Sequence, residues 1–435
     1  MIFRLLAVSL LCGFSLSAAP QAGGGVSLDG AVLVLRHPGV GLESRPDYGF
    51  HGIFITNGAT LRLGHLAGQS GAEYTIANDI EINRGVIEST AGNPHFTGRI
   101  TVGPRGATFI TRSKGQDIYF DSDVSGAGPL SIDNESGGTG GIVRFTNEIS
   151  LLGTLTITGG SPGFNGGRIF LGDPDALNQT TLVAVAGMRG IDFDPATKVF
   201  SLGGLEGNGN IDLQGKILRV GIVSTDTVFS GSLTDSVSGG NLVKSGSGSL
   251  TLTGNQSPTA NLSVYIGTLV VDGSVESEIK VGNPRIPLAR AVLSGTGSLA
   301  DILLQTPGAI LQPGPAGIAT GIINARNFSM IPGSNLSIRL GDHGCDQIHA
   351  SGQFSLYGNL EVSLIAGFRP KPGGVFYIMT TTGSAPVLGR FSNLVSNDFT
   401  AAGHRFRINY TADYKKNDPA STTGHDVALI VLPDK

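Results

Sequence analysis

The segment Leu242–Gly273, LVKSGSGSLTLTGNQSPTANLSVYIGTLVVDG, decides the fold of this chain of 435 residues. It holds two short runs in which apolar and polar residues alternate, Ser249–Thr253 and Gly267–Val271, joined by a polar, turn-rich bridge. Because side chains of an extended strand point alternately to opposite faces, Leu250 and Leu252 share one face. Glycines lead into each run, where the chain must turn sharply. We therefore expect this segment to be one coil of a structure that stacks.

An ordered set of residues in this segment forms a signature, namely Lys244, Gly246, Gly248, Leu250, Leu252, Thr253, Gly254, Asn255, Gly267, Thr268 and Leu269. This signature resembles the autotransporter-associated β-strand repeat, in which a lysine and spaced glycines precede a Thr-Leu strand and a later Gly-Thr-Leu. In the bridge, Ser257–Ala260 reads SPTA where the family has Tyr-x-Gly-x-Thr. The resemblance implies an all-β, right-handed parallel β-helix, and the crossover rule for parallel strands implies the same handedness.

Composition agrees with many short strands joined by glycine turns. The chain has 67 glycines, no tryptophan and only 14% charged residues, while leucine, valine and isoleucine are plentiful, which argues against disorder. No segment has a clean helical period, whereas strand-like runs recur along the chain, among them Thr75–Ile82 and Thr227–Leu233. The phrase of an aliphatic residue, a small residue, Gly-x-Gly and an alternating strand returns at Val124–Ile132, Leu205–Leu213 and Leu293–Leu299. Such self-similarity favours a solenoid over a large sandwich.

The expected organisation has three parts. Residues 1–19 read as a signal peptide, with Arg4 before the apolar run Leu5–Leu16, which is too short to span a membrane. Residues 23–330 form the repeat region, and residues 331–435 form a β-rich C-terminal cap with longer, more aromatic strands that closes the open edge of the solenoid. After signal cleavage only Cys345 remains, which excludes an intrachain disulfide.

The end of the chain limits the family resemblance to the passenger-type region. The last residues read DVALIVLPDK, one strand and a polar tail, and we expect no C-terminal translocator barrel. A bare passenger with its translocator on a separate chain is an alternative. No later segment is apolar for long enough to be a membrane-spanning helix in the mature chain. We expect a secreted or cell-surface protein, with the periplasm as the alternative location.

Two clusters could carry chemistry. Asp192 and Asp194 lie on one face of an expected strand, as a carboxylate pair or cation site would require, but a solvated turn before Pro195 is the favoured interpretation. Asp342, His343, Cys345 and Asp346, with His349, form the densest group of potential zinc ligands. Their spacing fits no standard zinc pattern, so a loop with a partly buried cysteine is favoured. We therefore expect no catalytic, cofactor or metal-binding residues.

These features favour an exported, non-enzymatic β-helix protein of the cell surface or extracellular matrix, with a role in adhesion or structure. The expected partners are cell-surface polysaccharide or other envelope proteins. A net charge of −4 without a Lys/Arg stripe argues against nucleic acid. The alternative is a carbohydrate-active β-helix enzyme, a polysaccharide lyase or hydrolase, which predicts acidic and basic side chains converging in one groove.

Overall fold

The fold is built from β-strands alone in the part of the chain that the structure describes. A computed structural model describes residues 26–29, 32–37, 52–65, 73–90, 92–111, 117–134, 142–158, 168–184, 190–257, 260–314 and 319–433. Every regular element in these ranges is a strand. The predicted signal peptide, residues 1–19, lies outside the described residues. Two compact units divide the chain, Met1–Leu218 and Arg219–Lys435.

Three parallel sheets form the first unit, and from β3 to β17 each coil contributes one strand to each sheet. Sheet A contains β1 (Val26–Asp29), β3 (Gly52–Thr56), β6 (Asp79–Asn83), β9 (Ile100–Val102), β12 (Val124–Gly126) and β15 (Ile149–Leu151). Sheet B contains β2 (Val32–His37), β4 (Thr60–His65), β7 (Gly85–Ser89), β10 (Ala107–Thr111), β13 (Leu130–Asn134), β16 (Thr154–Thr158), β18 (Leu177–Ala184) and β20 (Val199–Gly207). Sheet C contains β5 (Glu73–Ile76), β8 (Asn93–Phe96), β11 (Ile118–Phe120), β14 (Ile142–Phe145), β17 (Arg168–Leu171) and β19 (Gly190–Phe193). The short β21 (Ile211–Asp212) follows, and β22 (Ile217–Val220) crosses the unit boundary.

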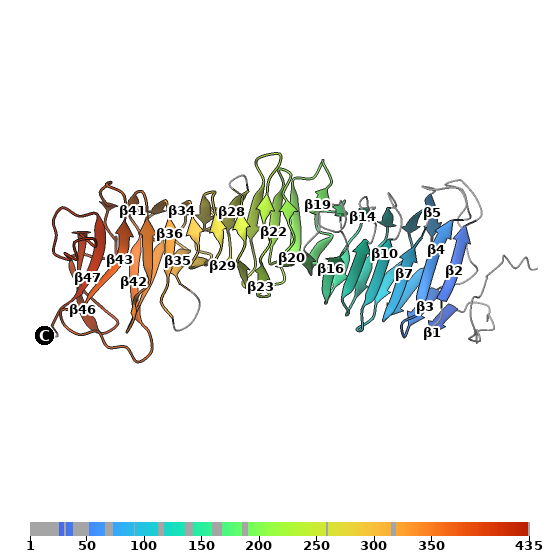
Figure 1. The fold of residues 1–435 in the computed structure, drawn as a ribbon, viewed down its shortest axis with the longest axis horizontal. Coiled ribbons are helices and arrows are strands. Elements are labelled where there is room, and N and C mark those ends of the chain that lie inside the picture. The colour runs from blue at the N-terminus through green and yellow to red at the C-terminus, as the bar shows by residue number, and fades with distance from the viewer. Residues whose placement is uncertain are drawn as a thin grey trace, which may run out of the picture. The chain divides into compact units, whose positions relative to one another are not determined.

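Stacking of equivalent residues builds the core of the first unit. Strands β4, β7 and β10 of sheet B lie side by side in chain order (Figure 1). Paired residues are one coil apart: Ile100 pairs with Val124, 24 positions on (124 − 100). Because one side chain in two points inward, each sheet contributes buried apolar rows along the stack. One such row in sheet C is Phe96, Phe120, Phe145, Leu171 and Phe193.

The second unit repeats the arrangement with three further sets of strands. Sheet D contains β25 (Asn241–Lys244), β28 (Asn261–Val264), β31 (Ile279–Val281), β34 (Asp301–Leu304), β37 (Asn327–Met330), β41 (Phe354–Leu356) and β44 (Leu388–Gly389). Sheet E contains β23 (Thr227–Phe229), β26 (Ser249–Leu252), β29 (Gly267–Val271), β32 (Ala291–Gly295), β35 (Ala309–Pro313), β38 (Asn335–Gly341) and β42 (Asn359–Leu364). The parallel part of sheet F contains β27 (Asn255–Gln256), β30 (Ser274–Val275), β33 (Ser298–Leu299), β36 (Ile322–Ala325), β40 (Gln347–Ala350) and β43 (Val375–Thr381). The short strand β24 (Leu233–Thr234) precedes β25, and the short strand β39 (Gly344–Cys345) pairs antiparallel with β38.

The segment that decides the fold behaves as its sequence predicts. Its alternating runs become β26 and β29, which pair in parallel with Leu250 opposite Leu269 and Leu252 opposite Val271. The runs therefore occupy the same sheet on successive coils, 19 positions apart (269 − 250). The prediction of an all-β parallel solenoid is confirmed.

Two of the expected strands are wrong in extent because each crosses a corner of a coil. The run Thr75–Ile82 is two strands, β5 and β6, in different sheets. No glycine or proline marks that corner, where Ala77 and Asn78 separate the strands, so the alternation of the sequence continues through it. The run Thr227–Leu233 likewise ends as a strand at Phe229, and Leu233 begins β24.

Strand direction changes near the C-terminus. Parallel pairing continues past residue 331 through β42 and β44. Sheet F then turns antiparallel, as β43 pairs with β47 (Asp426–Val431), β47 with β46 (His404–Ala412), and β46 with β45 (Asp398–Ala401). The division into repeat region and cap at residue 331 stays a prediction.

Candidate functional site

The signature lysine is a structural residue inside the coil. Lys244 is 1% exposed at the end of β25, and its ammonium group donates to the carbonyl oxygens of Ser245 (2.5 Å), Gly246 (2.9 Å) and Ile266 (3.4 Å). Burial lowers the pKa of Lys244 to about 8. Since Ile266 precedes β29 on the next coil, one side chain satisfies carbonyls of two successive turns.

The signature glycines allow the turns to stack closely. Gly246 has a φ of 70° and Gly267 a φ of 75°, in the left-handed region that favours glycine. A Cβ on Gly246 would overlap the carbonyl oxygen of Gly221, and one on Gly267 would overlap that of Gly246. Leu250, Leu252 and Leu269 face the core, so these signature residues build the coil rather than a ligand site.

The predicted carboxylate pair lies on the outer side of sheet C. Asp192 belongs to β19 and Asp194 follows it directly, and both are half-buried. The carboxylate of Asp194 accepts a hydrogen bond from Thr197 Oγ1 (2.9 Å). Lys216 donates to the backbone carbonyl of Asp194 (2.9 Å), and Lys198 donates to that of Gly215. The nearby lysines thus stabilise turns, and Arg189 lies outside the described residues.

The cluster around Cys345 separates into unrelated contacts. Asp346 is fully buried and accepts two hydrogen bonds from the Arg339 guanidinium, at 2.7 Å to Oδ2 and 3.1 Å to Oδ1. Cys345 donates to the carbonyl of Tyr377 (3.4 Å), and burial raises the pKa of its thiol to about 12. His349 Nδ1 lies 2.8 Å from Thr380 Oγ1. Asp342 and His343 are exposed in the β38–β39 hairpin.

The described ranges contain no group of three His, Cys, Asp or Glu side chains placed to hold a metal ion. Within the same ranges, no helix has the length and apolar character needed to cross a membrane.

A ladder of aromatic and charged side chains covers the outer face of sheet C. His95, Tyr119, Arg144, Phe170 and Asp192 pair in register on five successive strands. The His95 and Tyr119 rings are stacked, with centroids 4.0 Å apart, and the Arg144 guanidinium lies 5.6 Å from the Tyr119 centroid and 5.1 Å from that of Phe170. These five side chains are called the sheet C ladder.

Carboxylates hold the ladder in place. Asp117 accepts from Arg144 Nε at 2.8 Å, and Asp121 lies 2.6 Å from His95 Nδ1. Burial raises the pKa of Tyr119, and the charge of Asp117 raises it further. No local sequence pattern predicts this surface, although its members recur 22 to 26 positions apart. That spacing identifies them only when the coil length is known.

A polar groove of about 300 Å³ lies on the outer face of sheet D, lined among others by Glu278, Asp301, Asn327 and Gln353. Arg326 binds Asp301 through Nε (2.9 Å) and Nη2 (2.5 Å), which lowers the pKa of that carboxyl. Asn327 also donates to Asp301, at 2.8 Å. Carboxylate and amide groups of this kind can hydrogen-bond sugar hydroxyls.

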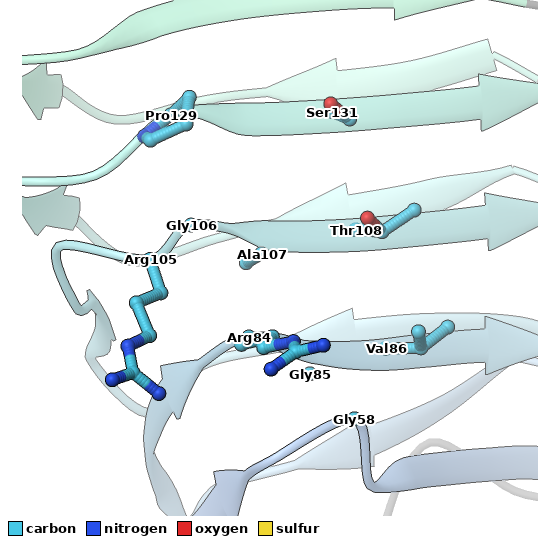
Figure 2. Close-up of a pocket in the computed structure, with 10 residues that line it drawn as sticks. All are labelled: Gly58, Arg84, Gly85, Val86, Arg105, Gly106, Ala107, Thr108, Pro129 and Ser131. Atoms are coloured by element: carbon cyan, nitrogen blue, oxygen red, sulfur yellow. The ribbon is translucent and has the colours of Figure 1, made fainter.

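A second hollow, of about 240 Å³, lies at the turn edge of sheet B and is called the arginine hollow. Figure 2 shows Arg84 and Arg105 on consecutive turns, with the Arg105 side chain extending toward the coil of Arg84. Val86, Thr108 and Ser131 follow one another on successive strands beside them. The complete lining is Gly58, Arg84, Gly85, Val86, Arg105, Gly106, Ala107, Thr108, Pro129 and Ser131.

Together these observations define a parallel β-solenoid with an apolar interior and outward rows of polar and aromatic side chains. No model of a known protein family matches the chain. Over 190 residues, 40% of its length, the chain is 28% identical to an "Adhesin BmaC autotransporter" of Brucella suis biovar 1 (strain 1330). Over 199 residues, 43% of its length, it is 30% identical to an "Extracellular serine protease" of Serratia marcescens.

The chain matches only a small part of either relative, 5% of the adhesin and 18% of the protease. The resemblance to an autotransporter passenger region, predicted from the repeat signature, is confirmed by this similarity together with the solenoid fold. Both relatives support an exported protein of the cell surface or the extracellular space.

Proposed function

We propose that this chain is a non-enzymatic β-solenoid of the cell surface or extracellular matrix that acts in adhesion or as a structural element. The observation that carries the proposal is the similarity of two fifths of the chain to part of an autotransporter adhesin. The solenoid supports it, because the inward rows are taken up by the core and the outward rows are open to a partner.

Outward rows suit an extended partner. Equivalent positions on neighbouring strands lie about 4.8 Å apart, so a partner that runs along the stack meets several similar groups. Weak contacts made together give far greater avidity than any one of them. The sheet C ladder and the polar groove of sheet D are such rows, and cell-surface polysaccharide or another envelope protein is the partner that we propose.

Localisation and binding can be tested together. We expect antibody to label the chain on intact cells or to detect it in the medium. We also expect the purified chain to bind cells or an envelope polysaccharide panel, and deletion of the gene to reduce cell attachment. Confinement to the periplasm in fractionation, or attachment unaffected by deletion, would contradict the proposal.

A carbohydrate-active enzyme is the second candidate, because Glu278 and Asp301 line one groove. Glycoside hydrolysis requires one carboxyl group that donates a proton and a second that acts as a base or nucleophile. Arg326 lowers the pKa of Asp301 and so favours its ionised form. A carboxylate that is already ionised at neutral pH is a poor proton donor. Release of reducing ends from a glycan panel, lost in Asp301→Asn and kept in the exposed control Asp398→Asn, would establish this candidate instead.

Proteolysis needs a separate assay because one relative is an extracellular serine protease. We expect the purified chain to leave casein intact over a prolonged incubation. Cleavage that a serine-directed inhibitor abolishes would overturn the non-enzymatic assignment.

A further inference from the structure

We propose that the arginine hollow of sheet B binds carboxylate groups of an acidic polysaccharide. This names a ligand class for one surface and rests on the proposed binding function. The hollow combines Arg84 and Arg105 with the hydroxyls of Thr108 and Ser131 and with the apolar Pro129. Figure 2 shows these groups on consecutive coils.

Among the residues that the structure describes, no carboxylate pairs with the cations of the hollow. Arg84 and Arg105 are exposed, and within the described part of the chain neither guanidinium has an ion-pair or hydrogen-bond partner. Several other arginines are paired: Arg62 lies 2.6 Å from Glu88, and Arg144 lies 2.8 Å from Asp117. Since guanidinium groups bind carboxylates through paired charge-assisted hydrogen bonds, two unpaired ones side by side form a site for an anion.

Backbone contacts fix the main chain of both arginines. Arg84 has a φ of 60°, and its amide donates to the carbonyl of Gly106 at 2.7 Å. The amide of Arg105 donates to the side chain of Asn83 at 2.9 Å. Each turn is therefore held by the adjacent coil, and the two side chains start from defined main-chain positions. Such preorganisation reduces the entropy lost on binding.

The rest of the hollow matches a sugar better than a bare anion. Val86, Thr108 and Ser131 are in register, and neighbouring strands of a sheet lie about 4.8 Å apart. Their hydroxyls can bond sugar hydroxyls, while Val86 and Pro129 can pack against ring carbons. A Cβ at Gly58 would meet nothing within 4 Å, so the hollow is open at that end. Each residue of a uronic acid polymer carries a carboxylate for the arginines, hydroxyls for Thr108 and Ser131, and ring carbons for the apolar side chains.

Binding of polygalacturonate by the purified chain tests the proposal, with an uncharged galactan of similar length as the reference polymer. Arg84→Asn with Arg105→Gln removes the two charges, and Asn tolerates the left-handed φ at position 84. The control carries Arg99→Gln with Arg219→Gln, two exposed arginines outside the hollow lining, and loses the same charge. Thermal unfolding checks that both variants are folded.

We expect polygalacturonate to bind more tightly than galactan, and the hollow variant to lose about tenfold in affinity, as two solvent-exposed charge pairs imply. The control should change little, and salt should weaken binding of the parent chain. Equal losses in both variants, or no preference for polygalacturonate, would overturn the proposal. Binding of inorganic polyphosphate alone through these arginines would also overturn it. No preference for polygalacturonate in a chain that still attaches to cells would reject this ligand and leave the proposed adhesion standing.

Discussion

The ammonium nitrogen of Lys244 lies 2.9 Å from the carbonyl oxygen of Gly246 and 3.4 Å from that of Ile266, so one side chain joins the turns of two coils. The contact explains why the signature combines a lysine with glycines. Close turns present carbonyls to a buried space, and a long flexible donor satisfies them. The burial that shields this contact from water also disfavours the charged ammonium group, and so lowers the pKa of Lys244 to about 8.

Raising the pH should increase the contribution of Lys244 to stability. Its pKa is about 8 in the folded chain against an ordinary 10.5, so between these values the unfolded chain binds more protons and the free energy of unfolding rises with pH. The gain from neutral pH to pH 10 is about 2 kcal/mol. Urea unfolding of the parent chain and of Lys244→Met, each at pH 7 and at pH 10, gives the difference in the free energy of unfolding between the two proteins. The change in that difference with pH measures the contribution of Lys244, because groups other than Lys244 titrate alike in both proteins. A constant difference would contradict the lowered pKa.

Gly267→Ala should destabilise the second unit by about 3 kcal/mol, because a positive φ and an overlap with neighbouring carbonyls act together. Gly373→Ala is the matched control: Gly373 has a φ of 84°, but a Cβ there would meet nothing within 4 Å. The control should cost only about 1 kcal/mol, from the backbone alone. Chemical unfolding compares the two, and equal losses would show that coil stacking does not require this glycine.

Adjacent residues of β11 should differ sharply in their effect on stability. Phe120 is 1% exposed and its ring lies 5.5 Å from that of Phe96 and 5.0 Å from that of Phe145. Phe120→Ala should therefore cost about 3–5 kcal/mol in the free energy of unfolding. Tyr119→Ala removes an outward ring and should cost about 1 kcal/mol. Thermal and urea unfolding decide, and comparable losses would contradict the assignment of inner and outer faces.

Asp346→Asn should cost about 3–5 kcal/mol, because it leaves the guanidinium of Arg339 buried without its counter-charge. The Asp398–Arg407 pair has similar geometry, with Nε 2.6 Å from Oδ1, but lies at the surface. Asp398→Asn should accordingly cost no more than about 1 kcal/mol. If urea unfolding gave the two variants the same stability, burial would not be the source of the difference.

Cys345 should be unreactive in the folded chain. With a pKa of about 12, its thiol forms almost no thiolate at pH 8, and the thiolate is the reactive species. Iodoacetamide at pH 8 should leave the peptide containing Cys345 unmodified in native conditions and modify it in urea, as peptide mass mapping would show. Rapid native labelling would contradict the raised pKa.

The alternation in Leu242–Gly273 was sufficient to predict its stacked strands, because period-two patterning and glycine turns are local properties. The same logic failed at Thr75–Ile82, where a corner without glycine separates β5 from β6. Corners depend on how a coil closes against its neighbours, which no single stretch of sequence encodes.

The candidate binding surfaces also combine features that the sequence predicts with features that depend on the tertiary structure. The sequence alone determined the solenoid, the role of the signature as scaffold, and the choice of Asp192 as a residue to inspect. Only the tertiary structure placed Asp192 beside Phe170 in the sheet C ladder, and Arg84 beside Arg105 in one hollow. The physical reason is the coil period: strand patterns repeat every two residues, whereas outward neighbours come from positions about one coil apart, a distance that varies from coil to coil.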